Sequence, residues 1–117
     1  MMKHDNLKEP TKQFALRIIR LVESLPKGRT SDVIGRQLLR SGTSVAANYR
    51  AACRARSTAD FISKMGMVEE ETDESMFWME ILVDANIMGK KLLSDLMNEA
   101  DELLAIFVAS IKTARKK

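Results

Sequence analysis

The sequence predicts an all-α protein that folds as an antiparallel up-down four-helix bundle. Apolar residues recur at three- and four-residue steps in four long segments, which is the period of amphipathic helices. The 117 residues include only five glycines and two prolines, too few turn residues for an all-β fold. Aromatic residues make up 5% of the chain and methionines number eight, so Leu, Ile, Met and Ala must fill the core. Short connections between four such helices favour a bundle, and the length suits one domain with its own core.

The first helix is expected over residues 11–24. Pro10 precedes it, at a position where the missing N–H of proline costs nothing. Pro26 and Gly28 then end it. Its buried face should consist of Phe14, Ile18, Leu21, Val22 and Leu25. Residues 1–10 are expected to be a flexible N-terminus, residues 11–114 the bundle and residues 115–117 a basic tail.

The second helix is expected to begin at Thr30, Ser31 or Asp32, which are all suitable N-caps, and to reach about Arg56. Its seam should contain Ile34, Leu38, Ser41, Val45, Asn48, Ala52 and Ala55. Gly35 and Gly42 fall inside this helix, and each costs about 1 kcal/mol relative to alanine. That cost implies a compensating role, either close helix approach or a bend.

The third helix should begin after the N-cap Ser57, with Asp60 at the reciprocal capping position, and continue to about Asn86. Its seam is Phe61, Met65, Val68, Thr72, Ser75, Met79 and Leu82. Gly89 is expected to break it. The fourth helix should span about residues 93–113, with an apolar face of Leu93, Leu96, Met97, Ala100, Leu103, Leu104, Phe107 and Ile111.

The second helix carries small residues on more than one side, which exceeds what a single bundle core needs. We therefore expect it to contact both its own bundle and a second subunit. Asn48 on the seam would need a hydrogen-bond partner if buried, and such a residue can fix oligomeric state, although it is equally well a lone polar core residue. The predicted oligomer interface comprises Asn48, Tyr49 and Trp78. For Trp78, packing in the core is an alternative, and a ligand pocket is a more distant one.

Four arginines form a predicted stripe along the second helix: Arg36, Arg40, Arg50 and Arg54. At about 100° per residue they fall within a sector of about 80°, and the ends of the stripe lie about 27 Å apart. Guanidinium groups suit phosphates, and a row of them can follow a nucleic acid backbone. Tyr49 is the only aromatic residue among them, so we expect contacts to backbone charge rather than base stacking.

Charge is divided unevenly along the chain. Residues 1–64 hold 13 lysines and arginines against five acids, whereas residues 65–117 hold six against 11. This division favours either a basic face turned to an external polyanion or pairing between the two halves. The stripe can therefore bind RNA or DNA, pair with the acids of residues 69–74 within or between chains, or be a solvated face.

The residue inventory argues against catalysis. His4 is the only histidine and lies in the expected flexible start, which removes Ser-His, Cys-His and di-iron Glu-x-x-His chemistry. Cys53 has no evident activating base and is expected to be a small buried residue. Glu70, Asp73 and Glu74 are a remote metal-carboxylate alternative to a solvated acidic face. We expect no enzyme activity, no metal and no other cofactor.

The segment LLRSGTSVAANYRAACRARSTADFISKMGMVEEETDESMFWMEIL, residues 38–82, resembles the four-helix-bundle family of proteins encoded by intervening sequences in bacterial 23S rRNA genes. The resemblance covers about residues 11–113 and implies a cytoplasmic, non-catalytic up-down bundle that assembles as a homopentamer. The family is similar to the accessory variability protein of diversity-generating retroelements, which binds nucleic acid and a reverse transcriptase.

From the residues and the resemblance together, we expect a cytoplasmic, non-enzymatic homo-oligomer that binds nucleic acid backbone through Arg36, Arg40, Arg50 and Arg54. The alternative is an adaptor whose arginine stripe pairs with the acids of the third helix across subunits without nucleic acid. A protein partner fits either hypothesis. With no apolar run of about 18 residues, no membrane contact is expected.

Overall fold

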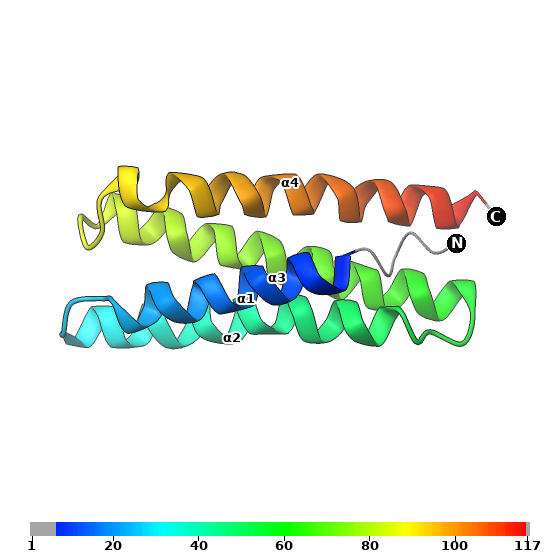
Figure 1. The fold of residues 1–117 in the computed structure, drawn as a ribbon, viewed down its shortest axis with the longest axis horizontal. Coiled ribbons are helices and arrows are strands. Elements are labelled where there is room, and N and C mark those ends of the chain that lie inside the picture. The colour runs from blue at the N-terminus through cyan, green and yellow to red at the C-terminus, as the bar shows by residue number, and fades with distance from the viewer. Residues whose placement is uncertain (1–6, 117) are drawn as a thin grey trace.

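The computed structural model describes residues 7–116 and consists of four helices: α1 (Lys8–Glu23), α2 (Arg29–Ala52), α3 (Thr58–Asp84) and α4 (Lys90–Arg115). Together they form a rod of 47 × 20 × 19 Å in which successive helices run antiparallel (Figure 1). No strand occurs within residues 7–116. The predicted all-α four-helix fold is confirmed, and the predicted flexibility of residues 1–6 lies outside the described residues.

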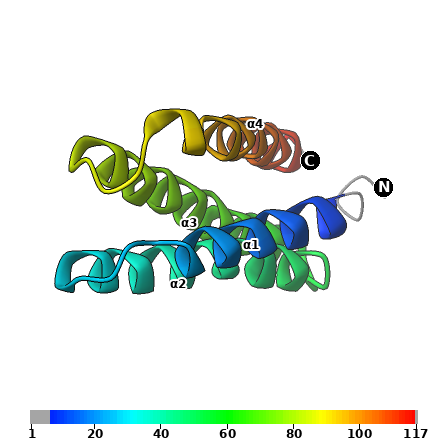
Figure 2. The same ribbon diagram turned by 60° about the vertical axis from the view of Figure 1, so that its left-hand side comes forward.

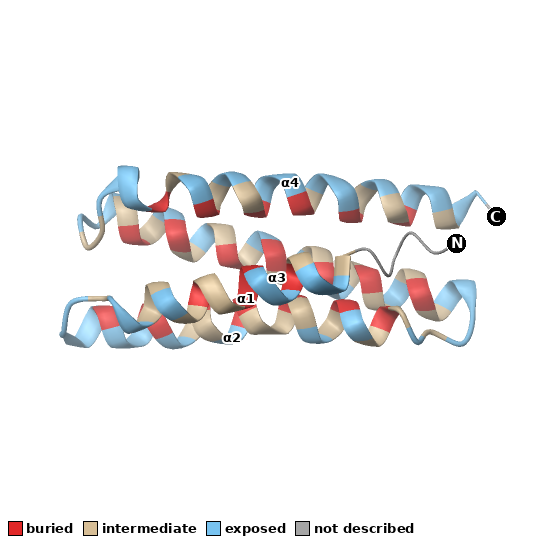
Figure 3. Ribbon diagram, in the orientation of Figure 1, coloured by how far each residue is buried: buried red, intermediate tan, exposed pale blue. Residues whose placement is uncertain are grey.

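The helices pack in chain order rather than as a closed square. α2 lies between α1 and α3, and α4 packs against α3, whereas α1 and α4 contact each other far less (Figure 2). An ion pair between Arg17 and Glu99 bridges this more open side. Buried residues face the centre of the rod and form one contiguous core (Figure 3).

Helix α1 begins at Lys8, three residues before the predicted start, so the structure places residues 8–10 inside the helix. Pro10 fits there because the N–H groups of the first turn have no partner within the helix. Thr11 is fully buried, and its Oγ1 donates a hydrogen bond to the carbonyl of Leu7 at 2.7 Å. α4 likewise extends past the prediction, through Arg115.

Helix α2 begins at Arg29 and has Gly28 as its N-cap, not one of the three predicted polar caps. Gly28 has a φ of 154°, a conformation that favours glycine because it has no Cβ. The helix ends at Ala52, with Cys53 as its C-cap, four residues before the predicted end. Arg54 therefore lies beyond the helix, in the turn that leads to α3.

The predicted cap at the start of α3 is confirmed. Ser57 Oγ accepts a hydrogen bond from the backbone N–H of Asp60 at 3.0 Å. The Asp60 carboxylate in turn accepts from Lys64 Nζ at 2.8 Å and from the backbone N–H of Arg56 at 3.3 Å. These hydrogen bonds, Lys64 first, hold the pKa of Asp60 below its ordinary range.

Helix α3 ends at Asp84, and the residue responsible is Asn86 rather than the predicted Gly89. Asn86 has a φ of 60°, and the N–H groups of Asn86 and Ile87 bond to the carbonyls of Val83 and Leu82. This is the Schellman arrangement, in which a left-handed residue satisfies the last carbonyls of a helix. Gly89 instead precedes α4 as its N-cap.

The core confirms the predicted face of α3, since all seven seam residues are buried. Three of its buried polar groups are hydroxyls on α2 and α3. Ser75 Oγ lies 2.9 Å from both Ser41 Oγ and the carbonyl oxygen of Glu71, and Thr72 Oγ1 donates to the carbonyl of Val68 at 2.7 Å. Because these hydroxyls have partners, their burial is tolerated.

The C-terminal part of α2 differs from the predicted seam by one position. Tyr49, not Asn48, occupies the core: its side chain is 1% exposed and its ring lies 6.0 Å from that of Phe107. Asn48 is half-buried. Tyr49 is therefore enclosed within its own subunit, which removes its side chain from the predicted oligomer interface.

Candidate nucleic-acid interface

The four arginines of the predicted stripe are all exposed, but they do not act as one set. Arg36, Arg40 and Arg50 project from α2, and Arg54 follows in the turn after the helix. Their surroundings divide them into a paired residue in the middle, one residue near the start of α2 and two residues at its end.

Arg40 is engaged by two acids of α3. Its Nη1 lies 3.1 Å from Glu71 Oε1, and its Nη2 donates a hydrogen bond to Glu74 Oε2. The hydrogen bond to Glu74 is the largest influence that raises the pKa of Arg40. Arg40 was predicted to bind nucleic acid; in the structure its guanidinium group already faces two carboxylates of the same subunit, so binding a phosphate would require these ion pairs to break.

Glu74 connects Arg40 to an aromatic pair. Its Oε2 also accepts a hydrogen bond from Trp78 Nε1 at 3.0 Å, and the Trp78 ring meets Phe77 edge-on with centroids 4.9 Å apart. The hydrogen bonds from Arg40 and then Trp78 lower the pKa of Glu74. Trp78, predicted at an oligomer interface, is half-buried and packs against the core from its edge.

Arg36 lies toward the other end of the rod. It helps to line a shallow open hollow of about 340 Å³ between the end of α1 and the start of α2. The remaining lining residues are Val22, Leu25, Ser31, Asp32, Gly35 and Leu39. Fourteen positions separate Arg36 from Arg50, about 21 Å along a helix, with the paired Arg40 between them.

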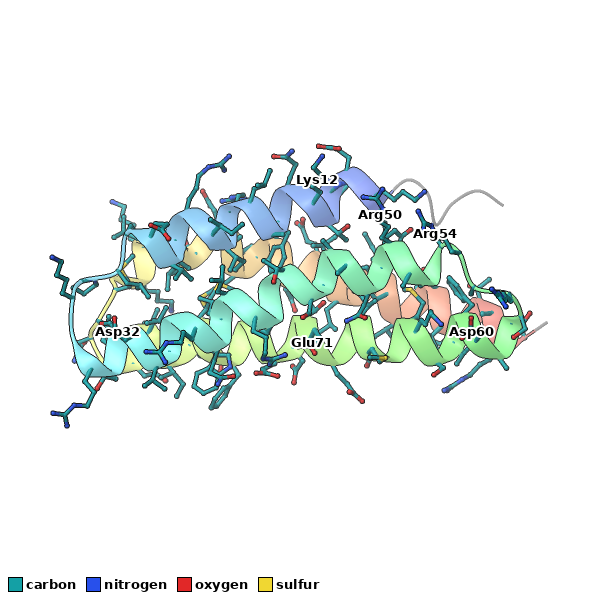
Figure 4. The ribbon with its side chains drawn as sticks, turned by 90° about the horizontal axis from the view of Figure 1, so that it is seen from below. Lys12, Asp32, Arg50, Arg54, Asp60 and Glu71 are labelled. Atoms are coloured by element: carbon teal, nitrogen blue, oxygen red, sulfur yellow. The ribbon has the colours of Figure 1, made fainter. Side chains whose placement is uncertain are left out.

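A basic cluster of Lys12, Arg50 and Arg54 lies where α1 begins and α2 ends (Figure 4). All three side chains are exposed, and none takes part in the ion pairs found among residues 7–116. The predicted stripe did not include Lys12. The antiparallel pairing of the first two helices was the signal that could have found it, since it brings the first turns of α1 beside the last turns of α2.

The same end of the rod carries further positive charge. The C-terminus of α4 and the turn between α2 and α3 lie there together (Figure 1). The last turn of α4 contains Lys112 and Arg115, and Lys116 is its C-cap. All three are exposed, and the turn between α2 and α3 adds the exposed Arg56. The acids are concentrated elsewhere, because α3 alone contains eight of them against one lysine.

Other predicted chemistry receives no support from the arrangement. Glu74 faces Arg40 while Glu70 and Asp73 are exposed, and no group of three potential metal ligands occurs within the described part of the chain. Cys53 is half-buried at the end of α2, and His4 lies outside the described residues. Within residues 7–116, no helix combines the length and hydropathy needed to cross a bilayer.

The geometry defines a class of protein: a helical rod with a basic end and an acidic third helix. The sequence model of the 23S rRNA-intervening sequence protein family matches residues 6–109. The chain therefore belongs to this family. Its structure is similar to a crystal structure from Bacteroides thetaiotaomicron, described as a protein of unknown function from the S23 ribosomal protein family. The TM-score is 0.87 at 33% sequence identity, and the match covers 95% of this chain and 99% of the other. No curated protein matches the sequence.

Proposed function

We propose that this protein is a non-enzymatic bundle that binds the phosphate backbone of RNA or DNA through the basic cluster, Lys12, Arg50 and Arg54. The supporting observation is that these cations from α1, α2 and the following turn lie near one another where α1 begins and α2 ends, exposed and outside the ion pairs of residues 7–116. A cation without an acidic partner can neutralise a phosphate without first breaking an ion pair.

The residue types of the basic cluster favour backbone contacts over base recognition. The two arginines can each hold a phosphate with two parallel hydrogen bonds, whereas Lys12 acts as a point charge. The nearby aromatic residue of α2, Tyr49, is buried and so cannot stack on a base. Binding is expected to depend on charge and shape, with little preference for sequence.

The proposal is tested by electrophoretic titration of structured RNA at two salt concentrations. The double variant Arg50→Ala with Arg54→Ala should lose most of the binding, and Arg40→Ala should retain it because Arg40 is paired in the subunit. The wild type should bind at low salt and weaken as salt rises. No binding at low salt, or equal binding by the double variant, contradicts the proposal.

We also propose that the protein is a cytoplasmic homo-oligomer, with the pentamer as the expected state. The half-buried positions of Asn48 and Trp78 are compatible with an interface, and the mass of the assembly in light scattering tests it. The alternative function, an adaptor assembled by arginine–acid pairs between subunits, predicts that the Arg50→Ala and Arg54→Ala variant loses assembly. Intact assembly combined with lost nucleic-acid binding supports the basic cluster as a nucleic-acid site.

A further inference from the structure

We propose that the outward face of α3 is a docking surface for a partner protein that presents a basic amphipathic helix. This acidic ridge consists of Met67, Glu70, Asp73, Phe77, Glu80 and Asp84. The proposal concerns a different helix from the basic cluster and does not depend on nucleic-acid binding.

The acidic ridge combines two features that a purely solvated helix face would not need. Its residues are all exposed and recur at steps of three and four, so they share one side of α3. Met67 and Phe77 are each 48% exposed, although removing large apolar side chains from water is favourable in free energy. A helix with apolar residues on its outer side as well as its inner side indicates a second partner.

Phe77 is held in place by a chain of contacts that begins on α2. Arg40 donates to Glu74, Glu74 accepts from Trp78 Nε1 at 3.0 Å, and the indole ring packs edge-on against Phe77 at an interplanar angle of 69°. An aromatic side chain fixed before binding loses little conformational freedom on docking, which is typical of the anchor residues of interfaces. These contacts also give Arg40 a positioning role, because it holds the Glu74 carboxylate that accepts the hydrogen bond from Trp78.

Charge determines the kind of partner. The four carboxylates of the ridge, Glu70, Asp73, Glu80 and Asp84, take part in none of the ion pairs within residues 7–116. They flank Phe77 on both sides and would repel nucleic acid and any acidic surface. A basic helix with lysines around an apolar strip would neutralise them while it covers Met67 and Phe77, the helix-to-helix mode of recognition.

The test uses a synthetic 18-residue peptide of leucine and lysine, designed as an amphipathic helix, and the full-length protein. Trp78 is the only tryptophan of the chain and adjoins Phe77, so its fluorescence reports docking on the ridge directly. The wild type should bind with a change in this fluorescence. Phe77→Ala should weaken binding about tenfold, as for the loss of a central anchor. Glu70→Gln with Asp73→Asn should weaken it by a similar factor.

Matched control variants on α4 distinguish specific binding at the acidic ridge from non-specific attraction of the basic peptide to any acidic helix. Ile106 is 43% exposed, and Asp101 and Glu102 are exposed acids outside the ion pairs of the described chain. Ile106→Ala and the pair Asp101→Asn with Glu102→Gln should each change binding by less than about twofold. Equal losses in the α4 and α3 variants would overturn the proposal.

Two further outcomes are decisive. If the peptide leaves Trp78 fluorescence unchanged at saturation by calorimetry, the ridge is not the site. If the protein is an oligomer that Phe77→Ala dissociates, and the wild type does not bind the peptide, the occupant is a second copy and the proposal fails. RNA binding by Phe77→Ala should match the wild type, which keeps this test separate from that of the basic cluster.

Discussion

Gly42 of α2 and Ile18 of α1 lie closer than two ordinary side chains allow. A Cβ atom placed on Gly42 would lie 2.7 Å from Ile18 Cγ2 and 3.0 Å from its Cβ. Ile18 is fully buried and cannot swing aside. The glycine therefore lets the two helices approach at this point, which is the compensating role that its helix-propensity cost implied.

Replacing Gly42 with alanine should destabilise the protein. The clash with Ile18 costs about 1–3 kcal/mol, and the gain in helix propensity offsets about 1 kcal/mol of this, so the net loss is expected to reach up to about 2 kcal/mol. Urea unfolding followed by circular dichroism measures this difference in the free energy of unfolding.

Gly66 provides the matched control, since a Cβ there would meet no heavy atom within 4 Å. It lies inside α3, so Gly66→Ala should stabilise the protein by about 0.5–1 kcal/mol. A stabilising Gly42→Ala would show that α1 and α2 can separate without loss.

The periodicity of the sequence was sufficient for the fold and for most of the core. It placed the buried face of α3 correctly because Phe61, Met65 and Val68 begin an unbroken pattern of apolar and small residues. It failed at Asn48 and Tyr49, where a shift of one residue rotates the helix by about 100°. A small-residue run gives no amphipathic signal strong enough to distinguish the two positions.

The candidate site was less predictable, because contacts between helices determine which of its cations are paired with acids. Sequence spacing put Arg40 and Arg50 on one stripe, but only the antiparallel pairing of α2 with α3 brings Glu71 and Glu74 to Arg40. The same pairing leaves Arg50 beyond the reach of those acids, and the α1–α2 pairing supplies Lys12. The end of α2 at Ala52 was also missed, because alanine and arginine in residues 51–56 are strong helix formers.

The buried hydroxyls of Ser41 and Ser75 should stabilise the α2–α3 contact as a pair. Each single change to alanine removes the hydrogen bond between the two hydroxyls and is expected to cost about 0.5–1.5 kcal/mol. The double variant should cost less than the sum of the single variants, because the remaining hydroxyl no longer loses a partner. A double-mutant cycle from urea unfolding gives the coupling. Strictly additive costs would mean that the interaction free energy between the two hydroxyls, 2.9 Å apart, is zero.

The Glu74 carboxylate should make stability depend on acidity. Its pKa is lowered in the folded protein, first by Arg40 and then by Trp78. Its contribution is therefore present above the ordinary glutamate pKa of about 4.3 and is lost as the pH falls through the lower folded-state value. The pair is partly exposed, so Glu74→Gln should cost no more than about 1 kcal/mol at neutral pH, and this cost should shrink as the pH falls below the ordinary glutamate pKa.

Unfolding of wild type and Glu74→Gln across this pH range checks the prediction. Asp73→Asn is the control, because this neighbouring carboxylate is exposed and outside the ion pairs of residues 7–116. A Glu74→Gln difference that persists unchanged at low pH would assign it to lost packing rather than to the charge.

The salt dependence of RNA binding should reflect the number of cations in the basic cluster that neutralise phosphates. On single-stranded nucleic acid each neutralised phosphate contributes about 0.7 to the slope of log K against log salt, so Lys12, Arg50 and Arg54 predict a slope of about −2 per subunit. Arg50→Ala with Arg54→Ala should reduce its magnitude by about 1.4, whereas Arg40→Ala should leave it unchanged because that side chain already faces Glu71 and Glu74. Titrations of a single-stranded RNA at several salt concentrations give these slopes. A reduced slope for Arg40→Ala would mean that RNA displaces the two acids, and the binding surface would then extend along α2 rather than end at the basic cluster.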